Sequence, residues 1–173
     1  MCGIVVSLDS NPPTQKVDAA QIAQQHRGPD DGDTWISKPG FCCMGHRRLS
    51  ILDLSAAGKQ PMISPDGRYA IVFNGEIYNY IELRAELAGR FQFITKTDTE
   101  VLLASFIVWG ADCLQRLNGM FSFAIWDSKT HSLFLARDHL GVKPLYYFNT
   151  GNYFVFGSEI KSIFASGVCK KLV

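Results

Sequence analysis

Hydrophobic positions follow two kinds of pattern along this chain. Segments in which apolar residues return every three or four positions predict helices, and they lie at Lys16–Gln25, Ile81–Ala88, Thr99–Val108 and Glu159–Ala165. Short runs rich in Val, Ile, Phe and Tyr, bounded by Gly, Asp or Asn, predict strands, and they lie at Ile4–Leu8, Tyr69–Phe73, Phe121–Trp126, Leu133–Ala136, Leu145–Phe148 and Tyr153–Phe156. The two patterns together predict an α+β fold.

The strands predicted in the second half of the chain follow one another without a helix until the last of them. Turn sequences separate them, at residues 127–129, 141–144 and 150–152. This meander favours antiparallel pairing over βαβ crossovers. Many of the strands are apolar at nearly every position, which indicates sheets that are covered on both faces. A chain of 173 residues with 47% hydrophobic residues can bury a core, and we expect a single domain over residues 1–173.

Charge and cysteine content exclude several classes of protein. Seventeen basic and sixteen acidic residues give a formal charge of +1, and no run of like charges predicts contact with nucleic acid or an anionic membrane. The longest apolar run, Val101–Ala111, has about half the length that crosses a bilayer, and no signal peptide is evident. Five cysteines, of which Cys42 and Cys43 would point to opposite faces of a strand, do not indicate a disulfide framework. We expect a cytoplasmic protein with no nucleic-acid or membrane partner.

The common cofactor motifs are missing from the sequence. It contains no GxxxxGK[ST], GxGxxG, CxxC or HExxH. The acidic run Asp30–Asp33 lacks the alternate spacing of a calcium loop, so a solvated turn is the better interpretation. We therefore predict no cofactor and no metal ion for this chain.

Cys2 is the first candidate for chemistry. Removal of the initiator methionine would leave a residue with both a thiol and a free α-amine. An α-amine with a pKa of about 7.7–8.0 can take the thiol proton and later return it to a leaving group. The alternative is a small packing residue behind a retained methionine. Cys2 alone does not decide between the two.

The pair Asn74-Gly75 follows a predicted strand directly. Such a pair usually forms a hairpin turn, but a helical segment follows here in place of a returning strand. An Asn amide and a Gly backbone N–H are also suitable donors for a developing oxyanion. Both interpretations stay open at this stage.

Two further charged residues have a structural and a functional interpretation. Asp98 lies at the predicted start of a helix, where Thr97 and Glu100 have the spacing of a capping box. It either caps the helix or binds a cation. Arg48 is either a surface residue or the bidentate partner of a carboxylate.

At this point the sequence resembles the class II glutamine amidotransferase domains, and most closely the N-terminal domain of the glutamine-hydrolysing asparagine synthetases. The matching segments run in family order over almost the whole chain: MCGIV at the start, HRGPDD (26–31), HRRLSILDLS (46–55), FNGEIYNY (73–80), TDTEVLL (97–103), NGMFSFAIWD (118–127), ARDHLGVKPLYY (136–147) and FGSEIKSI (156–163). The combination is far more specific than any single segment.

The resemblance implies a fold, a reaction and a set of site residues. The fold is a four-layer αββα sandwich of the N-terminal-nucleophile hydrolase type with mostly antiparallel sheets. The reaction is hydrolysis of the side-chain amide of L-glutamine to glutamate and ammonia. The resemblance makes Cys2 the nucleophile with its own α-amine as base, and Asn74 and Gly75 the oxyanion hole. Arg48 would hold the substrate α-carboxylate, Glu76 and Asp98 its α-ammonium group, and the segment Arg48, Leu49, Ser50, Ile51 and Leu52 would line the pocket.

The sequence departs from the asparagine synthetases in one respect. Their ATP-pyrophosphatase domain begins with a Ser-Gly-Gly-x-Asp-Ser loop that is not found in these 173 residues. ATP and Mg would belong to such a synthetase domain or subunit, which would receive the ammonia as a partner. A catalytically silent module that binds glutamine or docks a synthetase, and a hydrolase of another amide, stay open as alternatives.

Overall fold

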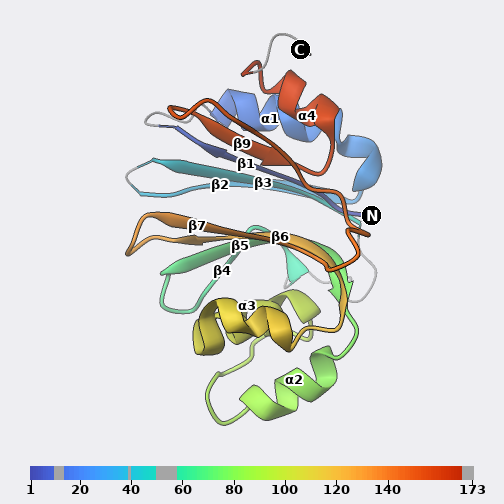
Figure 1. The fold of residues 1–173 in the computed structure, drawn as a ribbon, viewed down its shortest axis with the longest axis vertical. Coiled ribbons are helices and arrows are strands. Elements are labelled where there is room, and N and C mark those ends of the chain that lie inside the picture. The colour runs from blue at the N-terminus through green and yellow to red at the C-terminus, as the bar shows by residue number, and fades with distance from the viewer. Residues whose placement is uncertain (10–13, 39, 50–57, 169–173) are drawn as a thin grey trace.

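The computed structural model describes residues 1–9, 14–38, 40–49 and 58–168, and these form two stacked β-sheets (Figure 1). One sheet has five strands in the order β2 (Asp31–Ile36), β3 (Cys42–Arg48), β1 (Gly3–Leu8), β9 (Phe154–Gly157) and β8 (Tyr146–Asn149). The other has four strands in the order β4 (Met62–Ile63), β5 (Tyr69–Ile77), β6 (Gly119–Asp127) and β7 (Ser132–Arg137). All pairings between these strands are antiparallel.

Helices cover the outer face of each sheet, so the molecule has four layers (Figure 1). Helices α1 (Thr14–Ala23) and α4 (Ile160–Ala165) lie on the five-stranded sheet. Helix α3 (Asp98–Trp109) lies on the four-stranded sheet, and helix α2 (Tyr80–Leu87) packs against α3 in the same hydrophobic cluster. Short 3₁₀ segments, η1 (Gln25–Arg27) and η3 (Gly110–Gln115), follow α1 and α3. In the described residues no helix is long and apolar enough to cross a membrane.

Alternate residues of the central strands belong to different hydrophobic clusters. In β1, Ile4 and Val6 pack between the two sheets, whereas Val5 packs under α1 and α4. Since successive side chains of a strand point to opposite faces, a strand with helices on one side and a second sheet on the other must be apolar at both sets of positions. The burial of both faces of the strands, which the apolar runs predicted, is therefore confirmed.

Most of the predicted elements are present, with shifted ends. The predicted helices correspond to α1–α4, and the predicted strands to β1 and β5–β9. Strands β2 and β4 were not predicted, and β3 was indicated only by the strand-like segment around Cys42 and Cys43. Strand β2 contains most of the acidic run that we expected to form a turn. In place of a turn, Asp31 and Asp33 lie on this edge strand, where the Nζ of Lys59 is 3.9 and 3.6 Å from their carboxylates.

The predicted meander is in fact two hairpins in different sheets. Strands β6 and β7 pair in the four-stranded sheet, and β8 and β9 pair in the five-stranded sheet. The chain changes sheets between Arg137 and Tyr146, a segment that apolar periodicity does not distinguish from a hairpin turn. This crossing brings Lys143 to the same cavity as the N-terminal residues Met1 and Cys2.

Candidate active site

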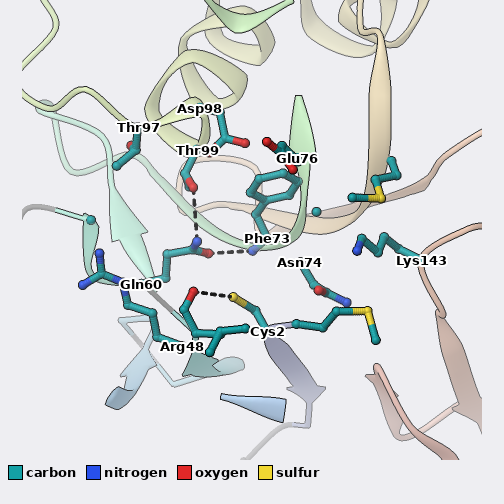
Figure 2. A pocket seen from close by; sticks show the side chains of 15 residues that line it. Cys2, Arg48, Gln60, Phe73, Asn74, Glu76, Thr97, Asp98, Thr99 and Lys143 are labelled. Atoms are coloured by element: carbon teal, nitrogen blue, oxygen red, sulfur yellow. Dashed lines mark hydrogen bonds between the residues drawn. The ribbon is translucent and has the colours of Figure 1, made fainter. Parts of the chain in front are cut away.

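A cavity of about 190 Å³ lies where the start of β1, the end of β3, the second half of β5 and the start of α3 meet (Figure 2). The structure brings seven of the predicted site residues to this cavity: Cys2, Arg48, Leu49, Asn74, Gly75, Glu76 and Asp98. The others, Ser50, Ile51 and Leu52, lie outside the described residues. Met1, Gly58, Gln60, Phe73, Thr97, Thr99, Met120 and Lys143 complete the lining.

Cys2 is fixed at the cavity because it immediately precedes a central strand. β1 lies between β3 and β9, so the N-terminal segment is held from both sides. The Nε of Arg27 donates to the Cys2 carbonyl oxygen at 3.0 Å, and the Arg27 Nη1 is 3.1 Å from Glu159. The Cys2 thiol is half-buried, 3.8 Å from the carbonyl oxygen of Leu49.

The N-terminal amine lies in an environment that favours its neutral form. Burial lowers the pKa of the Met1 amino group, and the nearby cations Arg27 and Lys143 lower this pKa further against the opposing effect of Cys2. Lys143 is 5% exposed and points into the cavity (Figure 2). Among the described residues, no hydrogen bond or ion pair occupies its ammonium group.

Asn74 is buried with an unused donor. Its side chain is 1% exposed, and its Nδ2 has no hydrogen-bond partner in the described part of the chain. A buried N–H without a partner costs about 1–3 kcal/mol, so such a group at a cavity is poised for a ligand acceptor. Asn74 is in the middle of β5, which continues to Ile77. The hairpin-turn interpretation of Asn74-Gly75 is therefore wrong.

Gly75 permits no side chain. A Cβ built on it would overlap the carbonyl oxygen of Met120 in the paired strand β6. The close approach of the two backbones requires glycine here.

The backbone N–H groups of β5 point alternately to β6 and to the opposite edge. On that opposite edge the Phe73 N–H donates to the Gln60 Oε1 at 2.7 Å, and the Ile77 N–H donates to the Asp98 Oδ2 at 3.1 Å. The strand period of two places the Gly75 N–H on the same edge, between these two. No described side chain accepts from it. Gly75 therefore offers its N–H to the cavity.

Cations and carboxylates lie in different parts of the cavity (Figure 2). Arg48 is 8% exposed at the end of β3, and Gly58 leaves the space that its guanidinium occupies, since a Cβ there would overlap the Arg48 Nη2. Glu76 and Asp98 lie together on β5 and α3. This separation suits a ligand with an anionic and a cationic group.

At the start of α3, Thr97 caps the helix and Asp98 does not. The N-cap is Thr97, whose hydroxyl accepts from the Glu100 N–H at 3.2 Å. Glu100 does not return the contact to Thr97 and instead accepts from the backbone N–H groups of Ile94 and Thr95, both at 2.7 Å. Only half of the predicted capping box is thus present. Asp98, the first helical residue, bridges to β5.

Burial dominates the titration of Asp98. It raises the pKa of this carboxyl to about 6, against the opposing effect of hydrogen bonds from the backbone N–H groups of Ile77, Thr99 and Asp98 itself, and the neighbouring Glu76 raises it further. A carboxyl with this pKa is poised to take a cationic partner.

Of the lining residues that sequence reasoning did not assign to the site, Gln60 and Lys143 have polar side chains that bear on its chemistry. Gln60 has no periodic or motif signal, because its importance comes from contacts with Phe73 and Thr99, far along the chain. Lys143 reaches the cavity because Asp138 accepts from its backbone N–H at 2.9 Å and Arg137 donates to its carbonyl oxygen at 2.6 Å. No group of three or more His, Cys, Asp or Glu side chains is placed to hold a metal ion in the ranges that the structure describes.

Comparison of the sequence with known families gives one match over residues 1–173, to the family described as the glutamine amidotransferase domain. The chain is 45% identical over 172 residues to asparagine synthetase [glutamine-hydrolyzing] 3 of Bacillus subtilis (strain 168), covering 95% of this chain and 28% of that protein. It is 44% identical over 171 residues to asparagine synthetase [glutamine-hydrolyzing] 1 of the same organism, covering 94% and 26%. The chain thus spans little more than a quarter of the length of these relatives.

Solved structures share the fold at lower identity. Glutamine phosphoribosylpyrophosphate amidotransferase from B. subtilis superposes with a TM-score of 0.81 at 22% identity, over 96% of this chain and 44% of that chain. The allosteric regulatory enzyme of purine biosynthesis superposes with a TM-score of 0.82 at 21% identity, over 96% and 43%. These likenesses show that the chain shares the two-sheet α+β fold of these two structures. The family match and the identities to the synthetases together establish that this chain belongs to the glutamine amidotransferase domain family.

Proposed function

We propose that this chain is the glutaminase unit of an amidotransferase, which hydrolyses the side-chain amide of L-glutamine to glutamate and ammonia. The observation that carries the proposal is the buried Asn74 Nδ2, which has no partner among the described residues, in the same cavity as the thiol of Cys2 and the backbone of Gly75. An acyl-transfer site needs a nucleophile facing donors for the oxyanion, and this cavity holds both.

The nucleophile is the Cys2 thiol after Met1 has been removed. The new α-amine takes the thiol proton, and sulfur attacks the carbonyl carbon of the side-chain amide. The amine then protonates the leaving nitrogen and the C–N bond breaks. Ammonia is released, and the glutamyl group remains bound to Cys2 as a thioester. Water, activated by the same amine, cleaves the thioester to glutamate. Arg27 and Lys143, the cations that lower the pKa of the Met1 amine, would lie near the Cys2 α-amine after Met1 has been removed.

The negative charge that develops on the amide oxygen is held by two donors. The Asn74 Nδ2 and the Gly75 N–H both belong to β5, and neither is occupied by a described side chain. Fixed donors of this kind act without reorganisation during the reaction.

Recognition of glutamine follows from the separated charges. Arg48 holds the α-carboxylate, and Asp98 with Glu76 receives the α-ammonium group. Leu49, Ser50, Ile51 and Leu52 would complete the wall of the pocket. A free amino acid is favoured over an acylated one, because an acyl group would leave Asp98 without its cationic partner.

The ammonia goes to an acceptor that these 173 residues do not contain. The synthetase relatives are glutamine-hydrolysing enzymes more than three times as long as the matched segment. We infer that an ATP-dependent synthetase domain or subunit receives the ammonia, and that ATP and Mg serve that part, while residues 1–173 form one glutaminase domain that needs no cofactor. We infer that the reaction takes place in the cytoplasm. A catalytically silent binding module would share the pocket but would not require a free Cys2 amine.

We expect Cys2→Ala to abolish glutamine hydrolysis while the protein remains folded, because the substitution removes the covalent route. A glutamine analogue with an electrophile at the amide carbon should label Cys2 alone. Burial raises the pKa of the Cys43 thiol to about 12 and that of Cys113 to about 11, which makes both unreactive. Intact mass should show the loss of one methionine from active protein. Activity above a few per cent in the Ala variant, or full activity with Met1 retained, would refute the mechanism.

Asn74→Ala should lower kcat by about 100- to 1000-fold, the usual loss for one oxyanion-hole donor, with a smaller effect on KM. Steady-state kinetics measure the effect of the substitution on catalysis, and thermal unfolding measures its effect on stability. Since the Asn74 Nδ2 has no partner to lose in the described part of the chain, the melting temperature should change little. Unfolding of the variant without a specific loss of kcat would assign Asn74 a structural role.

The pH profile should report Asp98. Because its pKa is about 6, the Asp98 carboxylate of the free enzyme is protonated below that pH and loses the charge that would bind the α-ammonium group of glutamine. Below the pKa of the amine, log kcat/KM should fall with slope one, and below about pH 6 with slope two, because a second proton then blocks binding. In Asp98→Asn the slope should stay at one, with KM raised about thirtyfold at neutral pH through loss of about 2 kcal/mol. An unchanged KM would return Asp98 to a purely structural role.

A further inference from the structure

Strand β5 loses its outer neighbour just before the proposed oxyanion hole. Within the described ranges β4 pairs with Ala70 and Ile71 alone, so from Phe73 onward the described partner strand of β5 lies on one side. A strand edge without a partner is free to shift or fray unless other groups take its backbone N–H and C=O. What holds this edge also fixes where Asn74 and Gly75 point.

Two buried side chains take both backbone polar groups of Phe73. The Gln60 Oε1 accepts from the Phe73 N–H at 2.7 Å, and the His46 Nε2 is 3.3 Å from the Phe73 carbonyl oxygen. Burial lowers the pKa of His46 to about 4, so the ring is neutral near neutral pH. Since a carbonyl can only accept, the proton of the neutral ring is on Nε2.

Gln60 also connects this edge to the helix that carries Asp98. Its Nε2 donates to the Thr99 hydroxyl at 3.2 Å, one residue after Asp98 (Figure 2). Asp98 in turn accepts from the Ile77 N–H. The edge of β5 is thus held at Phe73 and at Ile77, and the Gly75 N–H, which no described side chain engages, lies midway between these two points.

We propose that Gln60, together with His46, is a positioning residue for the oxyanion hole, clamping the Phe73 peptide so that the Asn74 amide and the Gly75 N–H face the Cys2 thiol. The inference rests on the proposed glutaminase function and deepens it. The clamp acts through β5 and not through substrate, because both ends of the Gln60 amide are already engaged by Phe73 and Thr99.

Gln60→Met tests the clamp, because it keeps the length of the side chain and removes both hydrogen bonds. We expect kcat to fall by about 10- to 100-fold with KM for glutamine changed by less than about twofold, since donors displaced by a fraction of an ångström lose mainly transition-state binding. Glutamate γ-semialdehyde, which forms a tetrahedral adduct with a thiol, should lose affinity by the same factor as kcat/KM. The affinity for glutamate should stay unchanged.

Two further variants separate positioning from stability. Thr99→Val removes only the acceptor of the Gln60 Nε2, so it should give a smaller loss of the same kind, and it tests the clamp even if Gln60→Met does not fold. Ser105→Ala is the matched control, because it removes a buried hydrogen bond to the Val101 carbonyl oxygen in the same helix, away from the cavity. We expect it to lower stability and leave kcat unchanged.

An unchanged kcat in both clamp variants, or a loss confined to KM, would overturn the clamp. Amide hydrogen exchange provides a readout that needs no activity: the Phe73 N–H should be protected in the wild type and exchange faster in Gln60→Met. An inactive wild type that shows this protection would refute the glutaminase proposal alone. Fast exchange at Phe73 in an active wild type would refute the clamp alone.

Discussion

The edge of β5 beyond the end of β4 is the constraint on which the rest of the site depends. A strand inside a sheet uses every backbone N–H in the ladder, and a strand at an edge leaves every second one open. Here the open groups at Phe73 and Ile77 are taken by the side chains of Gln60 and Asp98, and the one between them, at Gly75, is not taken by any described side chain. The sheet thus presents one backbone donor at a defined place.

The covered faces of the two sheets explain why this place is rigid. Residues that alternate along β5 pack under α3 on one side and against the five-stranded sheet on the other. A strand that is packed on both faces can shift only within the plane of its sheet. The side-chain hydrogen bonds at its edge prevent that shift. Low local polarity raises both the strength of a donor such as the Asn74 amide and the cost of leaving it unused. The same burial raises the pKa of Asp98 to about 6.

Much of this could be predicted from the sequence, and what was missed has a physical reason. Apolar runs located six strands, and the alternation of Ile4, Val5 and Val6 between two clusters is the packing that those runs predicted. Seven of the ten predicted site residues line one cavity, and the other three, Ser50, Ile51 and Leu52, lie outside the described residues. Turn propensity left a hairpin open at Asn74-Gly75, and the structure rejects it because pairing with β6 outweighs the local preference for a turn. Gln60 and Lys143 could not be found, since each is defined by contacts between distant segments and not by spacing.

A crystal structure of the adduct between Cys2 and glutamate γ-semialdehyde would test the central claim most directly. The account predicts the tetrahedral oxygen within about 2.7–3.1 Å of both the Asn74 Nδ2 and the Gly75 nitrogen, with the Phe73 N–H still bound to Gln60. It also predicts the α-ammonium group against Asp98 and the α-carboxylate against Arg48. An adduct whose oxygen points away from β5, toward Lys143 or solvent, would contradict it.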